Sequence, residues 1–142
     1  MFVTALELTN FRNYPEANIA LTSGVNVFVG SNGQGKTNLV EAVEYLSTAS
    51  SHRVASVVPL IRAGEESALV RARVQAGVDD ERELLLELEI ARGRQHQARL
   101  NRGPLPRARD LVGMLRTVVF SPMDLAIVRG DPSDRRRCCL LY

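Results

Sequence analysis

The sequence predicts an α/β fold in which a glycine-rich loop joins an apolar strand to an amphipathic helix. Residues 25–29 (VNVFV) are β-branched and nearly all apolar, which is typical of a buried central strand. Residues 30–36 contain three glycines and no large apolar side chain. Residues 37–47 then repeat apolar side chains at helical spacing. Strand, loop and helix in this order predict a βα unit, and alternating segments farther along the chain add an antiparallel β hairpin to it.

Composition indicates a folded chain of one domain or part of one. The 142 residues are 45% hydrophobic and 24% charged, values that suit a packed core. Apolar runs fall far short of the roughly 20 residues that span a bilayer. The first residues do not resemble a secretory signal, so the expected compartment is the cytoplasm. A net charge of +2 does not by itself indicate nucleic-acid binding.

The basic residues are biased toward one type. All but one of the 18 are arginine, and the exception is Lys36 in the glycine-rich segment. A compact ammonium on a flexible stem serves a different purpose from a planar guanidinium. The bias therefore marks Lys36 as a position where arginine would not serve.

The flanking segments contain further expected elements. Residues 2–9 alternate as a strand, residues 10–15 form a polar and aromatic turn, and residues 17–21 form a short second strand. In the helix of residues 37–47, we expect Leu39, Val43 and Leu46 to face the core, and Glu41 and Glu44 to lie on the polar side.

The second half of the chain is predicted to be mostly β. Residues 68–74 and 83–90 alternate and should pair as an antiparallel hairpin, with a third strand at 97–101. A short helix is expected at 107–114 and another apolar strand at 116–120. Two further helices are expected to begin at the capping sequences SPMD, from Ser121, and GDPSD, from Gly130.

The loop carries a phosphate-binding pattern. Residues 30–37 fit G-x-x-x-x-G-K-S/T at every fixed position. Its glycines let successive backbone N–H groups converge on phosphates, while the helix aims its positive end at the same point. Lys36 would reach the β- and γ-phosphates of ATP, and the Thr37 hydroxyl would bind magnesium. The expected nucleotide-binding residues are Gly30, Ser31, Asn32, Gly33, Gln34, Gly35, Lys36, Thr37 and Asn38.

Segments around the loop indicate which class of phosphate-binding-loop protein this sequence resembles. They are TNFRNY at 9–14, NGQGKTNLVEA at 32–42, SHR at 51–53, RLN at 99–101 and FSPMDL at 120–125, with GDPSDRRR at 130–137. In this order and spacing the sequence closely resembles the RecF family of DNA replication and repair proteins, which are relatives of the SMC proteins. The resemblance runs from residue 3 to residue 137 and implies a P-loop NTPase fold: lobe I of an ABC-type ATPase head with an antiparallel β subdomain, incomplete here.

The resemblance also implies a biological role. RecF-type proteins form ATP-dependent dimers on DNA at single-strand gaps or junctions of single and double strands, and help to load the recombinase RecA. RecR is the implied partner, RecO acts in the same pathway, and the work belongs to DNA repair and the SOS response. ATP and magnesium are the implied cofactors.

Other residues acquire candidate roles from the same resemblance. The Arg-Asn pair of the first turn lies beside the nucleotide phosphates in SMC-type heads, which implies that role for Arg12 and Asn13; Arg12 could instead be a solvated turn residue. His52 and Arg53 could face DNA or adenine, or occupy an ordinary loop. Residues 121–124 could form a switch loop, but a helix cap explains them better, and Met123 stands where the family tends to have an acid.

Arg71 and Arg73 lie on one face of an expected strand. They could touch the phosphate backbone of DNA. A solvated face in which they pair with glutamates is the favoured interpretation.

The family is much longer than this chain. Its Walker B acids, catalytic glutamate and signature motif have no counterpart in these residues, so we expect the chain to bind ATP without hydrolysing it. The resemblance divides the chain into a P-loop core at about 1–53, a β hairpin subdomain at about 66–105, and a return strand with the start of a second lobe at about 107–142.

Two other functions stay open at this stage. A different P-loop enzyme, such as a small-molecule kinase, would need a second acidic metal ligand, for which Asp79 and Asp80 are candidates in a turn-like context. The chain could also be a binding-only module or a non-functional truncated product.

Overall fold

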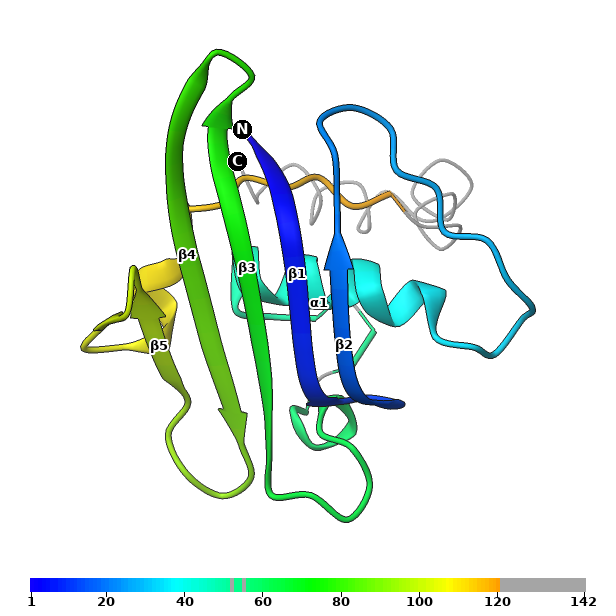
Figure 1. Cartoon of the computed structure of the whole chain (residues 1–142). Helices are drawn as coiled ribbons and strands as arrows, with labels where there is room; N and C mark the ends of the chain where they lie inside the picture. Colours follow the sequence, from blue (N-terminus) through cyan, green and yellow to red (C-terminus); the bar gives the residue numbers. More distant parts are fainter. Residues whose placement is uncertain (52, 55, 121–142) are drawn as a thin grey trace, which may run out of the picture.

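A single antiparallel sheet, with one helix lying across one of its faces, organises the part of the chain that the structure describes, residues 1–51, 53, 54 and 56–120 (Figure 1). This computed structural model gives the strand order β2-β1-β3-β4-β5-β6. The elements are β1 (Phe2–Phe11), β2 (Tyr14–Ala20), α1 (Lys36–Thr48), η1 (Val58–Leu60), β3 (Ser67–Gly77), β4 (Asp80–Ala91), β5 (Gln97–Leu100), β6 (Gly103–Pro104) and η2 (Ala108–Leu111).

The first hairpin confirms the two strands expected near the N-terminus and lengthens both. Phe11 pairs with Tyr14, which leaves Arg12 and Asn13 as a two-residue turn between β1 and β2. Arg12 has a positive φ of 54° and its N–H donates to the carbonyl oxygen of Leu60 at 2.8 Å. The turn is therefore tied to η1, which lies in residues 53–66, a segment whose pattern predicts no definite element.

The expected hairpin of the second half is also confirmed. β3 pairs with β4 from Ser67 with Ala91 to Gly77 with Asp80, with one shift of register between Gln75 and Gly77, and β5 adds the third strand at β4's other edge. Alternate residues of β3 are buried, as the period of two requires, whereas in β4 Leu86, Glu87 and Leu88 are buried in succession.

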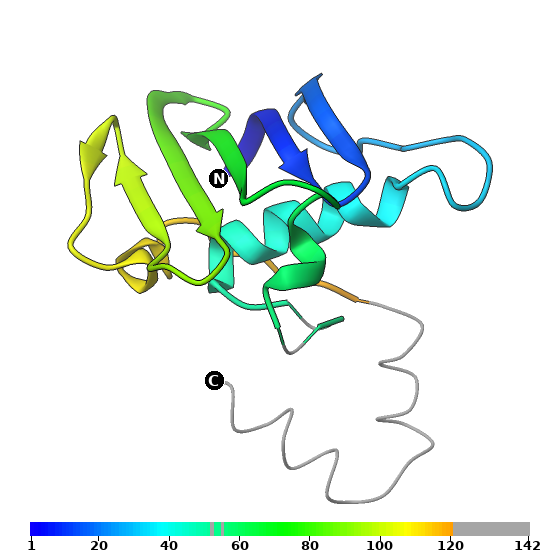
Figure 2. The ribbon, with the colours of Figure 1, turned by 90° about the horizontal axis from the view of Figure 1, so that it is seen from below.

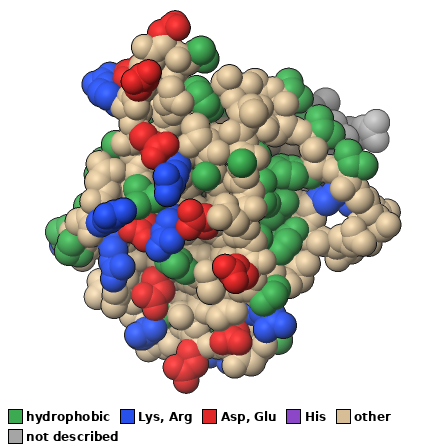
Figure 3. Space-filling model, in the orientation of Figure 1, with side chains coloured by type: hydrophobic (Ala, Val, Ile, Leu, Met, Phe, Trp, Pro, Cys, Tyr) green, Lys and Arg blue, Asp and Glu red, His purple; other side chains and the backbone are tan. Residues whose placement is uncertain are grey.

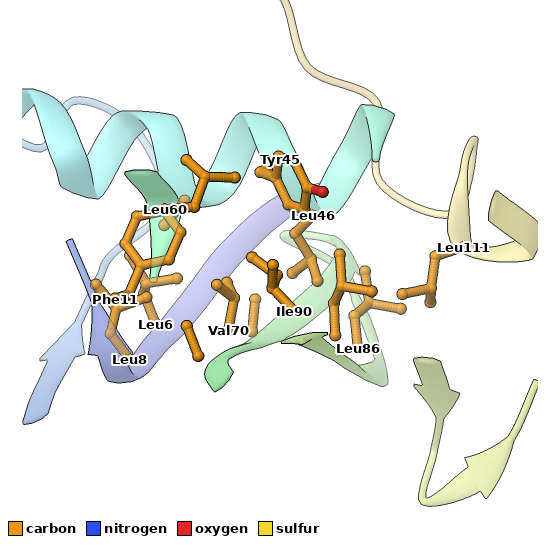
Figure 4. Packing of buried hydrophobic residues seen from close by; sticks show 14 of the residues in the cluster. Leu6, Leu8, Phe11, Tyr45, Leu46, Leu60, Val70, Leu86, Ile90 and Leu111 are labelled. Atoms are coloured by element: carbon orange, nitrogen blue, oxygen red, sulfur yellow. The ribbon is translucent and has the colours of Figure 1, made fainter. Parts of the chain in front are cut away.

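Helix α1 confirms the helical periodicity that follows the loop. It packs against the inner face of the sheet, and the core lies between them (Figures 2 and 4). The largest fully buried apolar side chains come from the helix, the sheet and the short 3-10 turns: Phe11, Leu6, Leu8, Leu46, Leu60, Leu86, Leu88, Ile90 and Leu111.

One detail of the helix prediction is wrong. Glu41 is completely buried and Glu44 is 9% exposed, so neither carboxylate lies on a solvated face. A helix that is covered by the sheet on one side and by the segments after it on another has a wider buried surface than its apolar residues alone indicate. A buried carboxylate needs charged or hydrogen-bonding partners, and for Glu41 these come from distant segments.

The expected central strand at residues 25–29 is not present. These residues belong to the segment that swings out beyond β2 and returns to α1, where they make no strand pairing (Figures 1 and 2). Val25, Val27 and Val29 are 89%, 75% and 90% exposed. A central strand forms only when strands pair with both of its edges, and the described residues provide none beside this segment.

The apolar segment at 116–120 also differs from its expected strand. Val118 and Phe120 are 85% and 76% exposed, while the Thr117 hydroxyl lies 2.5 Å from the hydroxyl of Ser47. That contact ties the segment to α1 and not to a neighbouring strand. Residues 107–114 were expected to be helical but contain only η2, which is a single 3-10 turn.

The two helices expected to begin at Ser121 and Gly130 lie outside the described residues. Across the ranges that the structure does describe, we find no helix with the length and apolar character needed to cross a membrane.

Candidate nucleotide site

The glycine-rich loop leads directly into the N-terminus of α1. The helix begins at Lys36, and Gly35 precedes it with a φ of 99° that side-chain-bearing residues rarely adopt. No side chain caps this end, and the first turn contains no acidic residue. The positive end of the helix is therefore left for an anion from outside the chain.

Lys36 folds back over the loop. Its Nζ donates to the carbonyl oxygens of Gly30 and Ser31, both at 2.7 Å. The ammonium is thus held against the loop backbone, where phosphate oxygens would compete for its protons. Residues 30–34 and Thr37 are exposed, so a ligand can reach both the loop and the Thr37 hydroxyl.

Asn13 fastens the loop to the first hairpin. Its Nδ2 donates to the carbonyl oxygen of Gln34 at 3.1 Å, and its Oδ1 accepts from Asn38 Nδ2 at 2.8 Å. A Cβ on Gly35 would come within 2.5 Å to 2.9 Å of the Asn13 side-chain atoms. Gly35 is therefore required for close approach as well as for its backbone conformation.

Arg12 turns inward and does not behave as a solvated turn residue. Its Nε and Nη2 donate to the two carboxylate oxygens of Glu41 at 2.9 Å and 2.5 Å. Only 14% of the Arg12 side chain is exposed. This bidentate pair joins the β1–β2 turn to α1 one turn beyond the phosphate-binding loop.

Arg53 and Ser51 complete the surroundings of Glu41. Arg53 Nη1 donates to Glu41 Oε2 at 2.8 Å and to Asn38 Oδ1 at 2.9 Å, and Ser51 Oγ donates to Glu41 Oε1 at 2.6 Å. The sequence left open whether Arg53 faces DNA or adenine or belongs to an ordinary loop, and the structure places its guanidinium beside α1. His52 lies outside the described residues.

The Glu41 carboxylate is held in its charged form. Burial alone would raise its pKa, but hydrogen bonds from Arg12 and Ser51, together with the charges of Arg12 and Arg53, outweigh that effect and lower the pKa. The Glu41 carboxylate is therefore negatively charged near neutral pH, between the guanidinium groups of Arg12 and Arg53.

Sequence reasoning missed Glu41 and Ser51 as site residues. Glu41 comes one helical turn before Tyr45, which is buried, so the two share a covered side of α1. That spacing could have indicated that Glu41 is buried. No comparable pattern pointed to Ser51, because its contact with Glu41 depends on the course of the chain after the helix.

The outer face of the sheet, opposite α1, carries a second charged region. Figure 3 shows basic and acidic side chains intermixed there. Arg71 donates to Glu87 and to Glu7, both at 2.8 Å, and Arg73 lies 3.8 Å from Glu83. This pairing confirms the favoured interpretation of a solvated, glutamate-paired face.

The same outer face has a hollow of about 350 Å³, lined by Glu7, Arg71, Arg73, Leu85, Glu87, Arg99 and Arg102. It lies away from residues 30–37. We therefore take the loop, with its converging donors and open helix end, as the candidate nucleotide site and not this hollow.

Comparison with known proteins decides the family. A sequence profile described as the RecF/RecN/SMC N terminal domain matches residues 2–126. The chain belongs to this family. The expected resemblance to RecF is confirmed by two proteins named DNA replication and repair protein RecF: one from Cutibacterium acnes is 64% identical over 96% of this chain, and one from a Nocardioides species is 61% identical over 96%.

These relatives are much longer than the present chain, which spans 34% and 32% of their lengths. A solved structure of the recombination mediator protein RecF-ATP in the RecFOR pathway shares the fold, with a TM-score of 0.82 and 32% identity. It covers 96% of this chain, which covers 37% of it. The predicted fold class, part of a P-loop ATPase head, is therefore confirmed.

Proposed function

We propose that this chain is the ATP-binding part of a RecF-type DNA replication and repair protein. The observation that carries the proposal is residues 30–37, which match the phosphate-binding pattern in full and open onto an uncapped helix with Lys36 folded over them. Support comes from the relatives named RecF and from the similar structure, in which the protein is described as RecF-ATP.

Magnesium fits the same site. The exposed Thr37 hydroxyl follows Lys36 at the position where this loop type provides a metal ligand. In the described ranges we find no group of three or more His, Cys, Asp or Glu residues able to hold a metal without help. We therefore propose that the metal is shared between Thr37 and the phosphates, where it would neutralise charge on the triphosphate.

The role of the whole protein extends the proposal. We propose that it acts on DNA at single-strand gaps or junctions, forms an ATP-dependent homodimer, and helps to load RecA with RecR as partner and RecO in the same pathway. A function in DNA repair and the SOS response would place it in the cytoplasm. The names of the RecF relatives support the repair role.

We further propose that these 142 residues bind ATP without hydrolysing it. Hydrolysis by a head of this type needs an acidic metal partner and a group that orients water, in addition to the phosphate-binding loop. Residues 30–37 supply Lys36 and Thr37, which form only the phosphate-binding part of such a site. The division at about 1–53, 66–105 and 107–142 stays a prediction.

The test is a titration of ATP with magnesium against the chain and against Lys36→Ala. We expect the wild-type chain to bind and the variant to lose affinity by about a hundredfold, since a charged donor to the phosphates is removed. Glu89→Gln is the matched control. It removes a charge from β4 that pairs with Arg94, and it should bind as the wild type does.

Adding gapped DNA to the titration and measuring phosphate release distinguish the RecF-type role from the other candidate functions. Gapped DNA in the titration should change the affinity for ATP if the chain acts in a RecF-type role, whereas a small-molecule kinase would be indifferent to it. Absence of ATP binding in the wild-type chain would contradict the proposal and leave the non-functional product. Phosphate release that Lys36→Ala abolishes would contradict binding without hydrolysis.

A further inference from the structure

A continuous hydrogen-bonded path connects Glu41 to the backbone of the phosphate-binding loop. Arg53 Nη1 bridges Glu41 Oε2, at 2.8 Å, and Asn38 Oδ1, at 2.9 Å. Asn38 Nδ2 donates to Asn13 Oδ1 at 2.8 Å, and Asn13 Nδ2 donates to the Gln34 carbonyl oxygen at 3.1 Å. The path ends on the residue before Gly35, where the loop enters α1.

Glu41 also gathers three separate segments. Arg12 reaches it from the β1–β2 turn, Ser51 and Arg53 reach it from the segment after α1, and Glu41 itself belongs to the helix. The carboxylate is completely buried, and its oxygens accept from four donor atoms on these partners. One buried acceptor thus sets the relative positions of the elements that surround the loop.

The two arginines are held to different degrees. Arg12 makes a bidentate pair and is 14% exposed, whereas Arg53 gives Glu41 a single hydrogen bond and is 36% exposed. Arg53 is also the link that continues to Asn38. The Arg53 contact is therefore the weaker of the two ion pairs and the one from which hydrogen bonds continue to the loop.

Resting on the proposed function, we propose that Glu41 is a positioning residue for the phosphate-binding loop. It touches no phosphate itself. Its charge fixes the guanidinium of Arg53, which aligns Asn38 and Asn13 against Gln34 and so holds the backbone N–H groups of the loop in their converging arrangement. A loop that is ordered before binding loses less conformational entropy when it takes up a triphosphate.

The test compares MgATP affinity in the wild-type chain, Glu41→Gln and Glu89→Gln, each at a temperature well below its unfolding midpoint. Glutamine keeps the shape of Glu41 but lacks the charge that holds two arginines. We expect about tenfold weaker binding, equivalent to about 1.4 kcal/mol. A purely structural Glu41 would lower the unfolding midpoint and leave the affinity of the folded chain unchanged. Glu89→Gln, on an exposed pair, should match the wild type.

Arg53→Gln provides a second variant in case Glu41→Gln does not fold. Arg53 is partly exposed, so its loss threatens the fold less. We expect at least threefold weaker binding. In the double variant the loss should be smaller than the product of the two single losses, because both substitutions break the same path.

The outcomes separate this proposal from the proposed function. Wild-type binding that is lost in Lys36→Ala but unchanged in both Glu41→Gln and Arg53→Gln would overturn the positioning role and leave the nucleotide site standing. Independent, fully multiplicative effects would also overturn it. Failure of the wild-type chain to bind MgATP would remove the nucleotide site and the positioning role together.

Discussion

Two ion-pair clusters of opposite stoichiometry lie on opposite sides of this small fold. Behind the loop, one acid, Glu41, lies between two arginines, whereas on the outer face of the sheet one arginine, Arg71, lies between Glu7 and Glu87. Their distances are similar. Their burial is not, since Glu41 is completely buried and Arg12 is 14% exposed, whereas Arg71 and Glu7 are 34% and 28% exposed and Glu87 alone is buried in the outer cluster.

The difference shows that burial, more than the number of charges, decides what such a cluster does. Water screens the outer cluster and can replace a lost partner there. Around Glu41 a lost partner leaves a charge that little water can reach. The inner cluster therefore fixes the positions of segments, while the outer one contributes modestly to the stability of a sheet surface.

The largest expected effect comes from deleting the central group of the inner cluster. Glu41→Ala should lower the free energy of unfolding by about 3 kcal/mol, because Arg12 would be left buried without its carboxylate. Urea denaturation at neutral pH measures this. Glu7→Ala in the outer cluster, where the carboxylate is 28% exposed, is the comparison and should cost less than about 1 kcal/mol. Equal losses in the two variants would contradict the distinction.

Gly35→Ala should have the next largest effect. The added Cβ would meet the Asn13 side chain, and the positive φ would be strained, at a cost of about 2 kcal/mol. Combining it with Asn13→Ala should recover part of the loss by relieving the contact but not the strain. If thermal unfolding shows no recovery, the contact between Asn13 and the loop is not what excludes a side chain at Gly35.

Acid should weaken the inner cluster. Because the pKa of Glu41 is lowered on folding, its contribution to stability is complete above its ordinary value of 4.5 and is lost as the pH falls through the folded-state pKa. The difference in unfolding free energy between the wild type and Glu41→Gln should therefore shrink below about pH 4.5. Asp80, whose pKa Arg82 lowers to about 2, is present in both chains and cancels. A difference that does not change with pH would contradict a charged Glu41.

The smallest effect is expected for Arg73→Met on the same outer face. Arg73 and Glu83 are 54% and 45% exposed, so screening limits the loss to less than about 1 kcal/mol, and added salt should reduce it further. Affinity for MgATP should be unchanged. A loss of several kcal/mol, insensitive to salt, would place this pair in the same class as the inner cluster.

Local patterns predicted the antiparallel part of the fold well. The alternation in residues 68–74 and 83–90 reports directly which side chains face the core, so β3 and β4 could be located from sequence. Residues 25–29 have an equally clear apolar pattern, yet Val27 is 75% exposed. An apolar pattern indicates that a segment is suited to burial, but a strand forms only where neighbouring strands are available to pair with it.

The candidate site was predicted in part. Loop residues 30–37 follow from a contiguous pattern, because their chemistry depends on adjacent backbone groups. Glu41 was assigned to the polar side of the helix because its charge is visible in the sequence and its partners are not. Arg12 precedes the phosphate-binding loop in the chain and Ser51 follows α1, so the two contact the same carboxylate only once the chain has folded.

The most direct test of the nucleotide site is a set of backbone amide NMR spectra of the 142-residue chain, recorded with and without MgATP. We predict that the amide signals of Gly33, Gly35, Lys36 and Thr37 shift strongly on binding, while those of Arg71 and Arg99 at the outer hollow stay in place. Shifts confined to the outer hollow, or no shifts at saturating MgATP, would contradict it.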